Sequence, residues 1–210
     1  MRTNYLQDIS DPFLTDIELA HLMRVTPHAR HSWVKRAIKK GDLIPVKRGL
    51  YCVNRKYILN RRYIDLFELA FRIYGPSYIS LESALSYHGW IPERVVTVAS
   101  ASMKRSYVLT NSLGIFTFHC VPKKVFYAGV EVKKQNDGVF YMARPWTALA
   151  DYVHVNKKDW KGIHPVYVSL RVEEEEDVVS SFHADAEMLF NNYPSRRVQR
   201  FLKGVMRDLQ

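Results

Sequence analysis

Apolar positions in the first sixty residues recur twice at helical spacing, and two short apolar runs follow. The segment LTDIELAHLM predicts the first helix, which either Thr15 or Asp16 can cap. A second helix is expected from Pro27, because Thr26 is a good N-cap and proline suits the first helical position. Gly41 is expected to end that helix as a left-handed cap. The residues of the first helix that are available to a core are Ile17, Leu19, Ala20 and either Leu22 or Met23.

The second predicted helix has an apolar face and a polar face on a helical wheel. Its apolar face holds Val34, Ala37, Ile38 and, toward the edge, Trp33. Its polar face holds His28, Ser32, Lys35, Arg36 and Lys39, with Arg30 and His31 nearer the border. Apolar runs at 43–46 and 50–53 then flank Lys47, Arg48 and Gly49, which is typical of a hairpin. This order of elements predicts a winged helix-turn-helix in residues 1–60.

Further helices are expected from residue 63 onward. One covers YIDLFELAFRIY and ends at the Gly75–Pro76 pair, and another covers LESALSYHG, capped by Ser80 and stopped by Gly89. PWTALADYVHV predicts a third. Ser195 is expected to cap a last, amphipathic helix. The apolar side of that helix is Val198, Phe201, Leu202 and Val205.

Strand patterns lie between these helices. RVVTVASA, SYVLT and GIFTFHCV are candidate strands, and VEVKKQNDGVFYM predicts a hairpin with its turn at 136–138. HPVYVSLRV is a further candidate strand, and the acidic run 173–177 is expected to be a loop or the start of a helix. The predicted fold class is therefore α+β, with a mostly antiparallel sheet in a second domain over residues 61–210.

The charge is unevenly distributed between the two predicted domains. The formal net charge is +10, and residues 1–62 hold 13 Lys and Arg against 5 Asp and Glu. Residues 63–210 hold the remaining 18 against 16. The excess of positive charge in the first domain favours an anionic partner.

Double-stranded DNA is the anionic partner that the pattern favours most. A basic, polar helix face suits docking in the major groove, where Lys and Arg neutralise phosphates and Arg, His and Ser also reach base edges. Lys47 and Arg48 in the predicted wing would hold the flanking backbone. The alternatives are a solvated basic helix beside an ordinary hairpin, or a winged helix used for protein contacts. The DNA-binding residues predicted are His28, Arg30, His31, Ser32, Lys35, Arg36, Lys39, Lys47 and Arg48.

Composition excludes several other classes of protein. Cys52 and Cys120 are the only cysteines, which leaves neither a disulfide framework nor a four-cysteine zinc site. The first ten residues do not have the pattern of a signal peptide, and no apolar run approaches the length of a membrane span. We expect a cytoplasmic protein with no membrane contact, no cofactor and no bound metal.

Motifs for catalysis are sparse. No Gly-rich phosphate loop, nucleophile elbow or His-Glu-x-x-His motif occurs. His183, Asp185 and Glu187 are close in sequence, but no further ligand stands at an evident spacing, which favours a polar helix face over a metal site.

Glu131 and Lys133 are the strongest enzymatic candidates. Glu-x-Lys on a strand is half of a restriction-endonuclease-type metal site, in which the carboxylate holds a divalent ion. That site needs an upstream acid, and Glu93 is the nearest upstream acidic residue. Asp151 fits a packing or capping role better than a catalytic one. The sequence therefore predicts that the protein is not an enzyme, with a metal-dependent nuclease as an alternative.

Three segments in order, KRGLYCV, PSYISLESALSYHGWIPE and ARPWTALADYV, resemble the AbiE-type antitoxin family of bacterial abortive-infection, type IV toxin–antitoxin systems. The likeness runs from about Leu14 to Val153 and departs from the family at Pro145-Trp146-Thr147, where a charged pair usually follows the proline. Its most specific part is Tyr78–Glu93, with Ser80, Glu82, Ser83, Ala84, Leu85, His88 and Gly89 in the expected order.

The resemblance implies a repressor that acts on its own promoter, as well as an antitoxin against a nucleotidyltransferase-like toxin in phage defence. An inverted-repeat operator would be served by a dimer or by two monomers binding cooperatively, so the oligomeric state stays open. The alternative is a winged-helix transcriptional regulator whose second domain senses a ligand or dimerises.

Overall fold

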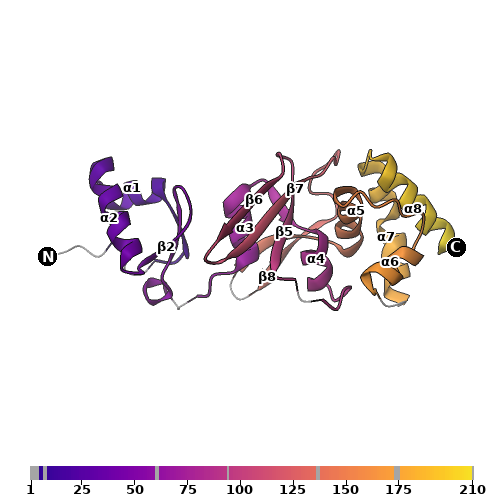
Figure 1. The fold of residues 1–210 in the computed structure, drawn as a ribbon, viewed down its shortest axis with the longest axis horizontal. Coiled ribbons are helices and arrows are strands. Elements are labelled where there is room, and N and C mark those ends of the chain that lie inside the picture. The colour runs from indigo at the N-terminus through magenta and orange to yellow at the C-terminus, as the bar shows by residue number, and fades with distance from the viewer. Residues whose placement is uncertain are drawn as a thin grey trace.

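The computed structural model describes residues 5–6, 9–59, 62–93, 95–135, 138–172 and 176–209. The chain is elongated, with an N-terminal module at one end, a six-stranded sheet in the middle and a group of helices at the other end (Figure 1). The fold is mixed α+β. Residues 136–137 of the predicted turn and 173–175 of the acidic run lie outside the described residues.

The N-terminal module contains two helices and a three-stranded antiparallel sheet. Three residues separate the helices, and the strand order in the sheet is β1-β3-β2. The predicted helices and the hairpin at 43–53 are confirmed, whereas the first strand was not predicted. The elements are β1 (Phe13–Thr15), α1 (Asp16–Met23), α2 (Pro27–Lys39), β2 (Leu43–Lys47), β3 (Leu50–Val53) and a 3-10 turn, η1 (Arg55–Tyr57).

Local capping explains where the two helices begin and end. Thr15 caps α1 in a capping box with Glu18, and Thr26 accepts a hydrogen bond from the Ala29 amide at 3.3 Å. Gly41 has φ +71°, the left-handed conformation expected after α2. The placement of Ile17 in a core is wrong, because its side chain is 71% exposed.

The sheet of the N-terminal module is covered on both faces. One face packs beneath α1 and α2 in a small core that includes Leu14, Leu43 and Val53. The opposite face belongs to the main core of the chain, which also holds the central sheet. Its residues in that core are Phe13, Val46, Leu50 and Cys52.

The central sheet has the order β6-β7-β5-β4-β9-β8. Antiparallel pairs are β4 with β5, β6 with β7 and β8 with β9, whereas β5 with β7 and β4 with β9 are parallel. The sheet is therefore more mixed than predicted, and the short β4 was not predicted. The strands are β4 (Ser77–Ile79), β5 (Thr97–Ser102), β6 (Tyr107–Asn111), β7 (Gly114–Cys120), β8 (Val130–Gln135) and β9 (Gly138–Ala143).

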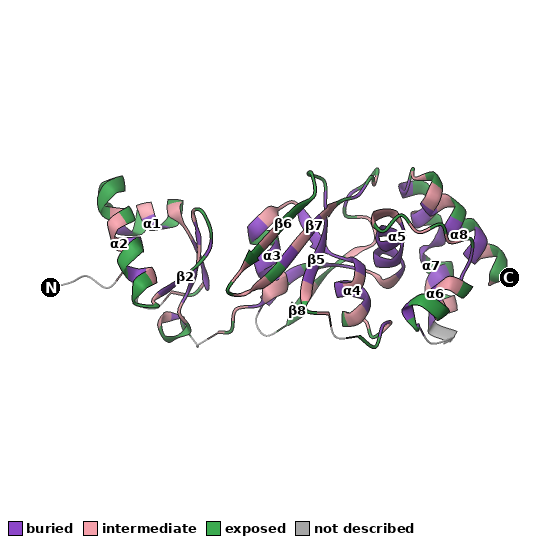
Figure 2. Cartoon of the chain, in the orientation of Figure 1, coloured by how far each residue is buried: buried purple, intermediate pink, exposed green. Residues whose placement is uncertain are grey.

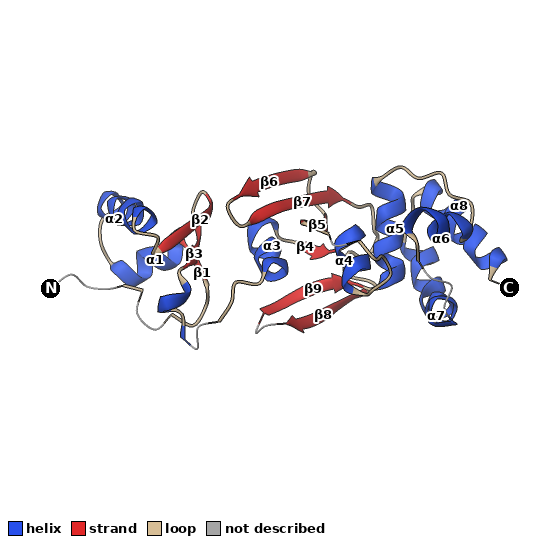
Figure 3. Ribbon diagram, turned by 60° about the horizontal axis from the view of Figure 1, so that its bottom comes forward, coloured by secondary structure: helices blue, strands red, loops and turns tan. Residues whose placement is uncertain are grey.

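Helix α3 (Leu66–Tyr74) lies between two diverging arms of this sheet (Figure 3). The arms meet at β4, whose register with β9 contains the single pair Ile79–Met142. Phe67 packs its ring against Phe140 of one arm, and Tyr74 packs against Phe118 of the other, with ring centroids 5.2 Å apart in each case. Aromatic side chains of α3 thus fill the opening between the arms.

The other helices lie toward the C-terminal end of the chain (Figure 1). The predicted strand HPVYVSLRV is wrong, because this segment forms helix α6. Val166 and Leu170 are buried one helical turn apart, whereas Val168 is 65% exposed, which is the spacing of a helix face. The helices are α4 (Leu81–Tyr87), α5 (Pro145–Val155), α6 (His164–Leu170), α7 (Glu176–Asn192) and α8 (Arg196–Asp208).

Candidate nucleic-acid interface

Helix α2 exposes its outer face to solvent (Figure 2), and the charged side chains on that face are basic. Val34 and Ala37 are buried and fix the inner face against the small core. Ser32 is partly buried, and the sequence of α2 contains no Asp or Glu. The exposed polar side chains are those predicted from the helical wheel: His28, His31, Lys35, Arg36 and Lys39.

Arg30 is engaged inside the N-terminal module. Its Nε and Nη2 donate to the two carboxylate oxygens of Asp16, at 3.0 and 2.9 Å. This bidentate bond lowers the pKa of Asp16 and raises that of Arg30. Arg30 therefore fastens α2 to the start of α1, so its guanidinium is already occupied.

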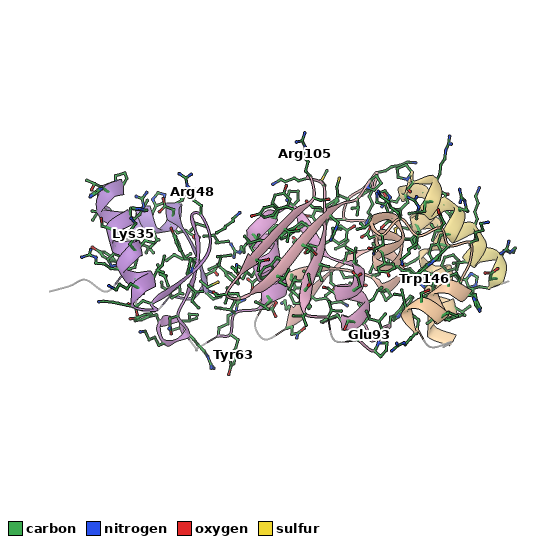
Figure 4. The ribbon with its side chains drawn as sticks, viewed as in Figure 1. Lys35, Arg48, Tyr63, Glu93, Arg105 and Trp146 are labelled. Carbon is green, nitrogen blue, oxygen red and sulfur yellow. The ribbon has the colours of Figure 1, made fainter. Side chains whose placement is uncertain are left out.

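The two cations of the hairpin lie in different surroundings. Lys47 Nζ donates to the Ile73 carbonyl at the end of α3, at 2.5 Å. Burial lowers the pKa of Lys47, and the nearby Lys104 lowers it further. Arg48 is exposed and projects from the tip of the hairpin (Figure 4). The structure thus bonds the Lys47 ammonium to the end of α3, although the residue as a whole is exposed, and leaves Arg48 available to a ligand.

Two polar contacts join the hairpin and the preceding loop to the rest of the chain. Asn111 at the end of β6 donates through Nδ2 to the Val46 carbonyl at 3.2 Å. Arg72 of α3 pairs with Asp11 at 2.8 Å, and its guanidinium lies 5.7 Å from the centre of the Phe13 ring. With the shared apolar core, these contacts hold the N-terminal module against α3.

Sequence reasoning missed two exposed cations beside the predicted set. Arg24 lies in the turn before α2, in the left-handed conformation with φ 49°, and Lys40 is the residue after α2. Their positions next to the helix could have indicated them. The basic surface therefore extends beyond both ends of α2.

A buried polar cluster lies in the second module. Asp151 of α5 is fully buried and accepts hydrogen bonds from the Tyr78 hydroxyl at 2.9 Å, Ser80 Oγ at 2.7 Å and the Tyr193 hydroxyl at 2.6 Å. Lys123 Nζ donates to the Ala128 carbonyl at 2.6 Å and lies over the Tyr78 ring. The Ser80 side chain, predicted to cap α4, makes no capping bond.

In this cluster a carboxylate, Asp151, and an ammonium group, Lys123, are both removed from water. Burial raises the pKa of Asp151, and the charge of Lys123 opposes that shift. Burial also lowers the pKa of Lys123 to about 8. Tyr78, Ser80 and Tyr193 are each at most 2% exposed, so a substrate has no access to the carboxylate. The cluster ties β4, the start of α4, the helix α5 and the loop before α8 together.

The segment 78–93 makes further packing contacts. Ser83 Oγ donates to the Thr97 carbonyl and accepts from the Ala99 amide, both at 2.8 Å, which joins α4 to β5. His88 Nε2 lies 2.9 Å from the Ala143 carbonyl, and burial lowers the pKa of this imidazole. These contacts give Ser83 and His88 structural roles.

The predicted nuclease residues are paired with basic side chains. Glu131 contacts Lys133 on the same strand at 2.5 Å, and Glu93 contacts Arg171 at 3.3 Å. Asp185 pairs with Arg144 at 2.8 Å. Among the residues that the structure describes, no group of three or more His, Cys, Asp or Glu side chains lies close enough to hold a metal ion.

An open groove of about 390 Å³ lies beside the start of α4. Glu82 and His119 contribute its titratable groups, and Thr97, Thr117 and Asn156 contribute polar ones. Burial lowers the pKa of His119, and the charge of Glu82 partly opposes that shift. The groove could hold a small polar molecule.

A scan against protein-family models and a search of curated proteins each found no match for this chain. Within the described ranges, none of the helices combines the length and the apolar character needed to cross a membrane.

Proposed function

We propose that the protein is a DNA-binding transcriptional repressor whose N-terminal module is a winged helix-turn-helix. The observation that carries the proposal is the exposed, acid-free face of α2, held by the small core and by the Arg30–Asp16 bond. A rigid helix with basic and hydrogen-bonding side chains outward suits the major groove. The uneven distribution of charge along the chain supports the same partner.

The side chains divide by role. Lys35 and Arg36 extend from the middle of the exposed face and would reach base edges in the major groove, as would His28 and Ser32 nearer the start of α2. Lys39 and Arg48 would hold phosphates on either side. Arg30 supports the helix, and Lys47 joins the modules.

The second part of the proposal is an antitoxin role against a nucleotidyltransferase-like toxin in phage defence. It is supported by the likeness of segments 47–53, 76–93 and 143–153 to AbiE-type antitoxins. In the fold, the last two of these segments meet at the Asp151 cluster. The autoregulated operon of that family is consistent with a DNA-binding N-terminal module.

Binding to the DNA upstream of this protein's own gene tests the repressor proposal. Lys35→Ala/Arg36→Ala is expected to weaken binding to that duplex at least about tenfold, and to reduce its preference over a scrambled duplex. Lys157→Ala/Lys203→Ala removes the same charge from exposed sites far along the chain and serves as the control. Equal, weak binding of the native protein to both duplexes would overturn the proposal.

The groove beside α4 favours a second candidate function, a repressor whose second module senses a small polar ligand. Metabolite screening by thermal shift, with Glu82→Gln as the comparison, tests it. A ligand that stabilises the native protein but not the variant would support sensing. Identical shifts in melting temperature for both proteins would count against ligand binding in the groove.

A further inference from the structure

Strand β8 forms one edge of the central sheet. It pairs with β9, and no strand of the described residues pairs with its outer side. The pair Gln135–Gly138 closes the hairpin and must exchange hydrogen bonds, so the backbone groups of Val132 and Lys134 point away from β9. The Val130 amide also points outward, because it donates to the Tyr127 carbonyl.

An apolar strip runs along one face of the sheet at this edge. Val132 lies opposite Tyr141 on β9, and the two side chains are 59% and 39% exposed. The Tyr141 ring contacts Phe71 and Tyr127, with centroids 5.6 and 5.2 Å apart. Val139, on the same face, is 48% exposed. Exposed apolar residues beside an open strand edge are typical of a surface that another chain covers.

We propose that a second copy of this chain pairs with β8 in antiparallel orientation, with Val132 on the two-fold axis. In this register Val132 faces Val132, Glu131 faces Lys133 of the second copy, and Val130 faces Lys134. The outward amide and carbonyl of Val132 then exchange hydrogen bonds across the axis, and the Lys134 amide donates to the Val130 carbonyl of the second copy, while each Val130 amide stays bonded to Tyr127. The two central sheets become one continuous sheet, and the apolar strips of both copies join across the axis.

The charges of β8 select this register. A shift of one pair in one direction places Lys133 opposite Lys133, and a shift in the other places Glu131 opposite Glu131. Like charges directly opposite are destabilising, whereas opposite charges stabilise a strand pair. Lysine on an edge strand usually discourages pairing, but here each Lys133 meets a carboxylate. The strand is therefore self-complementary in one register.

The other edge of the sheet also exposes apolar residues, but it lacks the charge pattern of β8. Strand β6 has the sequence YVLTN, which carries no charge to select a register. Asn111 at its end is bonded to the Val46 carbonyl of the N-terminal module. The self-complementary edge is therefore β8, and β6 provides a matched control.

Sedimentation equilibrium of the full chain over a wide concentration series tests the proposal. The native protein is expected to dimerise, and Lys133→Glu is expected to raise the dissociation constant about tenfold or more, because two Glu–Glu contacts replace two ion pairs. Glu131→Lys/Lys133→Glu restores both pairs and is expected to recover dimerisation. The recovery separates pairing across the axis from damage to the fold.

Crosslinking tests the register independently of affinity. In a Cys120→Ser background, Val132→Cys is expected to form a disulfide-linked dimer with diamide, because facing residues in a strand pair lie within disulfide reach. Val108→Cys on β6 has a similar native exposure, 60%, and is expected to stay monomeric. A protein that remains monomeric at every concentration would overturn the proposal, as would a dimer that Lys133→Glu leaves unchanged.

Discussion

Asp151 accepts hydrogen bonds from three hydroxyl groups, each at least 42 residues away from it in the sequence. Together with Lys123, these donors compensate a carboxylate that burial alone would neutralise. Helix α5 is held through this one side chain to the start of α4 and to the loop before α8. Asp151 therefore contributes to the folding of the second module.

Replacing Asp151 with Asn is expected to destabilise the protein by roughly 3 kcal/mol, because it leaves the Lys123 charge in a buried site without its partner. Chemical denaturation measures the change in unfolding free energy. Asp159→Asn makes the same substitution at an ion pair whose carboxylate is 73% exposed, and is expected to have little effect. Similar losses for both variants would contradict the role assigned to the cluster.

Lys123 also gives stability a pH dependence of known sign. Its pKa is about 8 in the folded protein, against an ordinary value of 10.5. Between these values the unfolded chain holds a proton that the folded chain has lost, so unfolding free energy rises with pH. Tyr78 and Tyr193 have folded-state pKa values raised well above the ordinary 10.0, so near pH 10 the unfolded chain loses their protons first, and their contribution to unfolding free energy falls with pH.

The comparison that isolates this contribution is the native protein against Lys123→Met. The stability difference is expected to shift in favour of the native protein as the pH rises from about 8 to 10.5. Thermal unfolding in a series of buffers across this range measures it. A difference that stays constant with pH would show that Lys123 titrates normally.

At the scale of elements, two adjacent residues of the β2–β3 hairpin lie in different surroundings. Lys47 reaches α3, and Arg48 faces solvent. The sequence predicts both as DNA contacts, since adjacent cations in a turn look alike. The difference between the two side chains arises from the Ile73 carbonyl, which belongs to a helix that folds against the hairpin.

Arg48→Ala is expected to lower the salt slope of DNA binding by roughly 0.9, the effect of one lost phosphate contact. Lys47→Ala is expected to leave that slope unchanged and to lower thermal stability instead. Binding titrations over a salt series, with melting curves of both variants, measure the two effects. A slope that falls equally in both variants would place Lys47 on the DNA.

The elements that sequence predicted correctly are those fixed by local chemistry. Thr15, Thr26 and Gly41 define the two N-terminal helices through bonds or backbone angles within a few residues. Helix α6 was mistaken for a strand, because its Val and Tyr residues favour strands and its neighbours decide otherwise. The Ser80–Asp151 bond spans 71 residues, so local spacing could not reveal it.

The outer face of α2 was predictable in a different way. Val34 and Ala37 repeat at helical spacing, and their burial fixes which side of the helix faces solvent. The partners of Arg30 and Lys47 could not be predicted from the sequence, because Asp16 and Ile73 belong to other elements. The described structure therefore adds the intramolecular partners of Arg30 and Lys47 to the predicted site.

At the scale of the whole molecule, the two predicted domains share a core. Phe13, Val46 and Leu50 are buried against residues of the central sheet, and the Arg72–Asp11 pair lies beside them. A boundary near residue 60 divides the chain by sequence pattern and charge. One apolar face of the N-terminal sheet packs across that boundary, whereas the small core under α1 and α2 lies within the first domain.

We expect the intact protein to unfold in a single calorimetric transition, because separation of the modules would expose this shared apolar face. A fragment ending at residue 62 is expected to melt at a lower temperature than the intact chain and to bind a hydrophobic dye. Calorimetry and dye fluorescence measure both effects. Two well-separated transitions in the intact protein would contradict the shared core.

Under the proposed DNA-binding function, the doubly covered sheet of the N-terminal module would also limit how the protein acquires a new operator. Recombination that replaced residues 1–60 would bring a foreign surface to α3 in place of Phe13, Val46, Leu50 and Cys52. The chimera would then need compensating changes in the second module. Mutations confined to the outer face of α2 avoid that conflict, because this face contacts neither core. Under that proposal, DNA specificity would diverge through point substitutions in one helix while the rest of the chain is inherited intact.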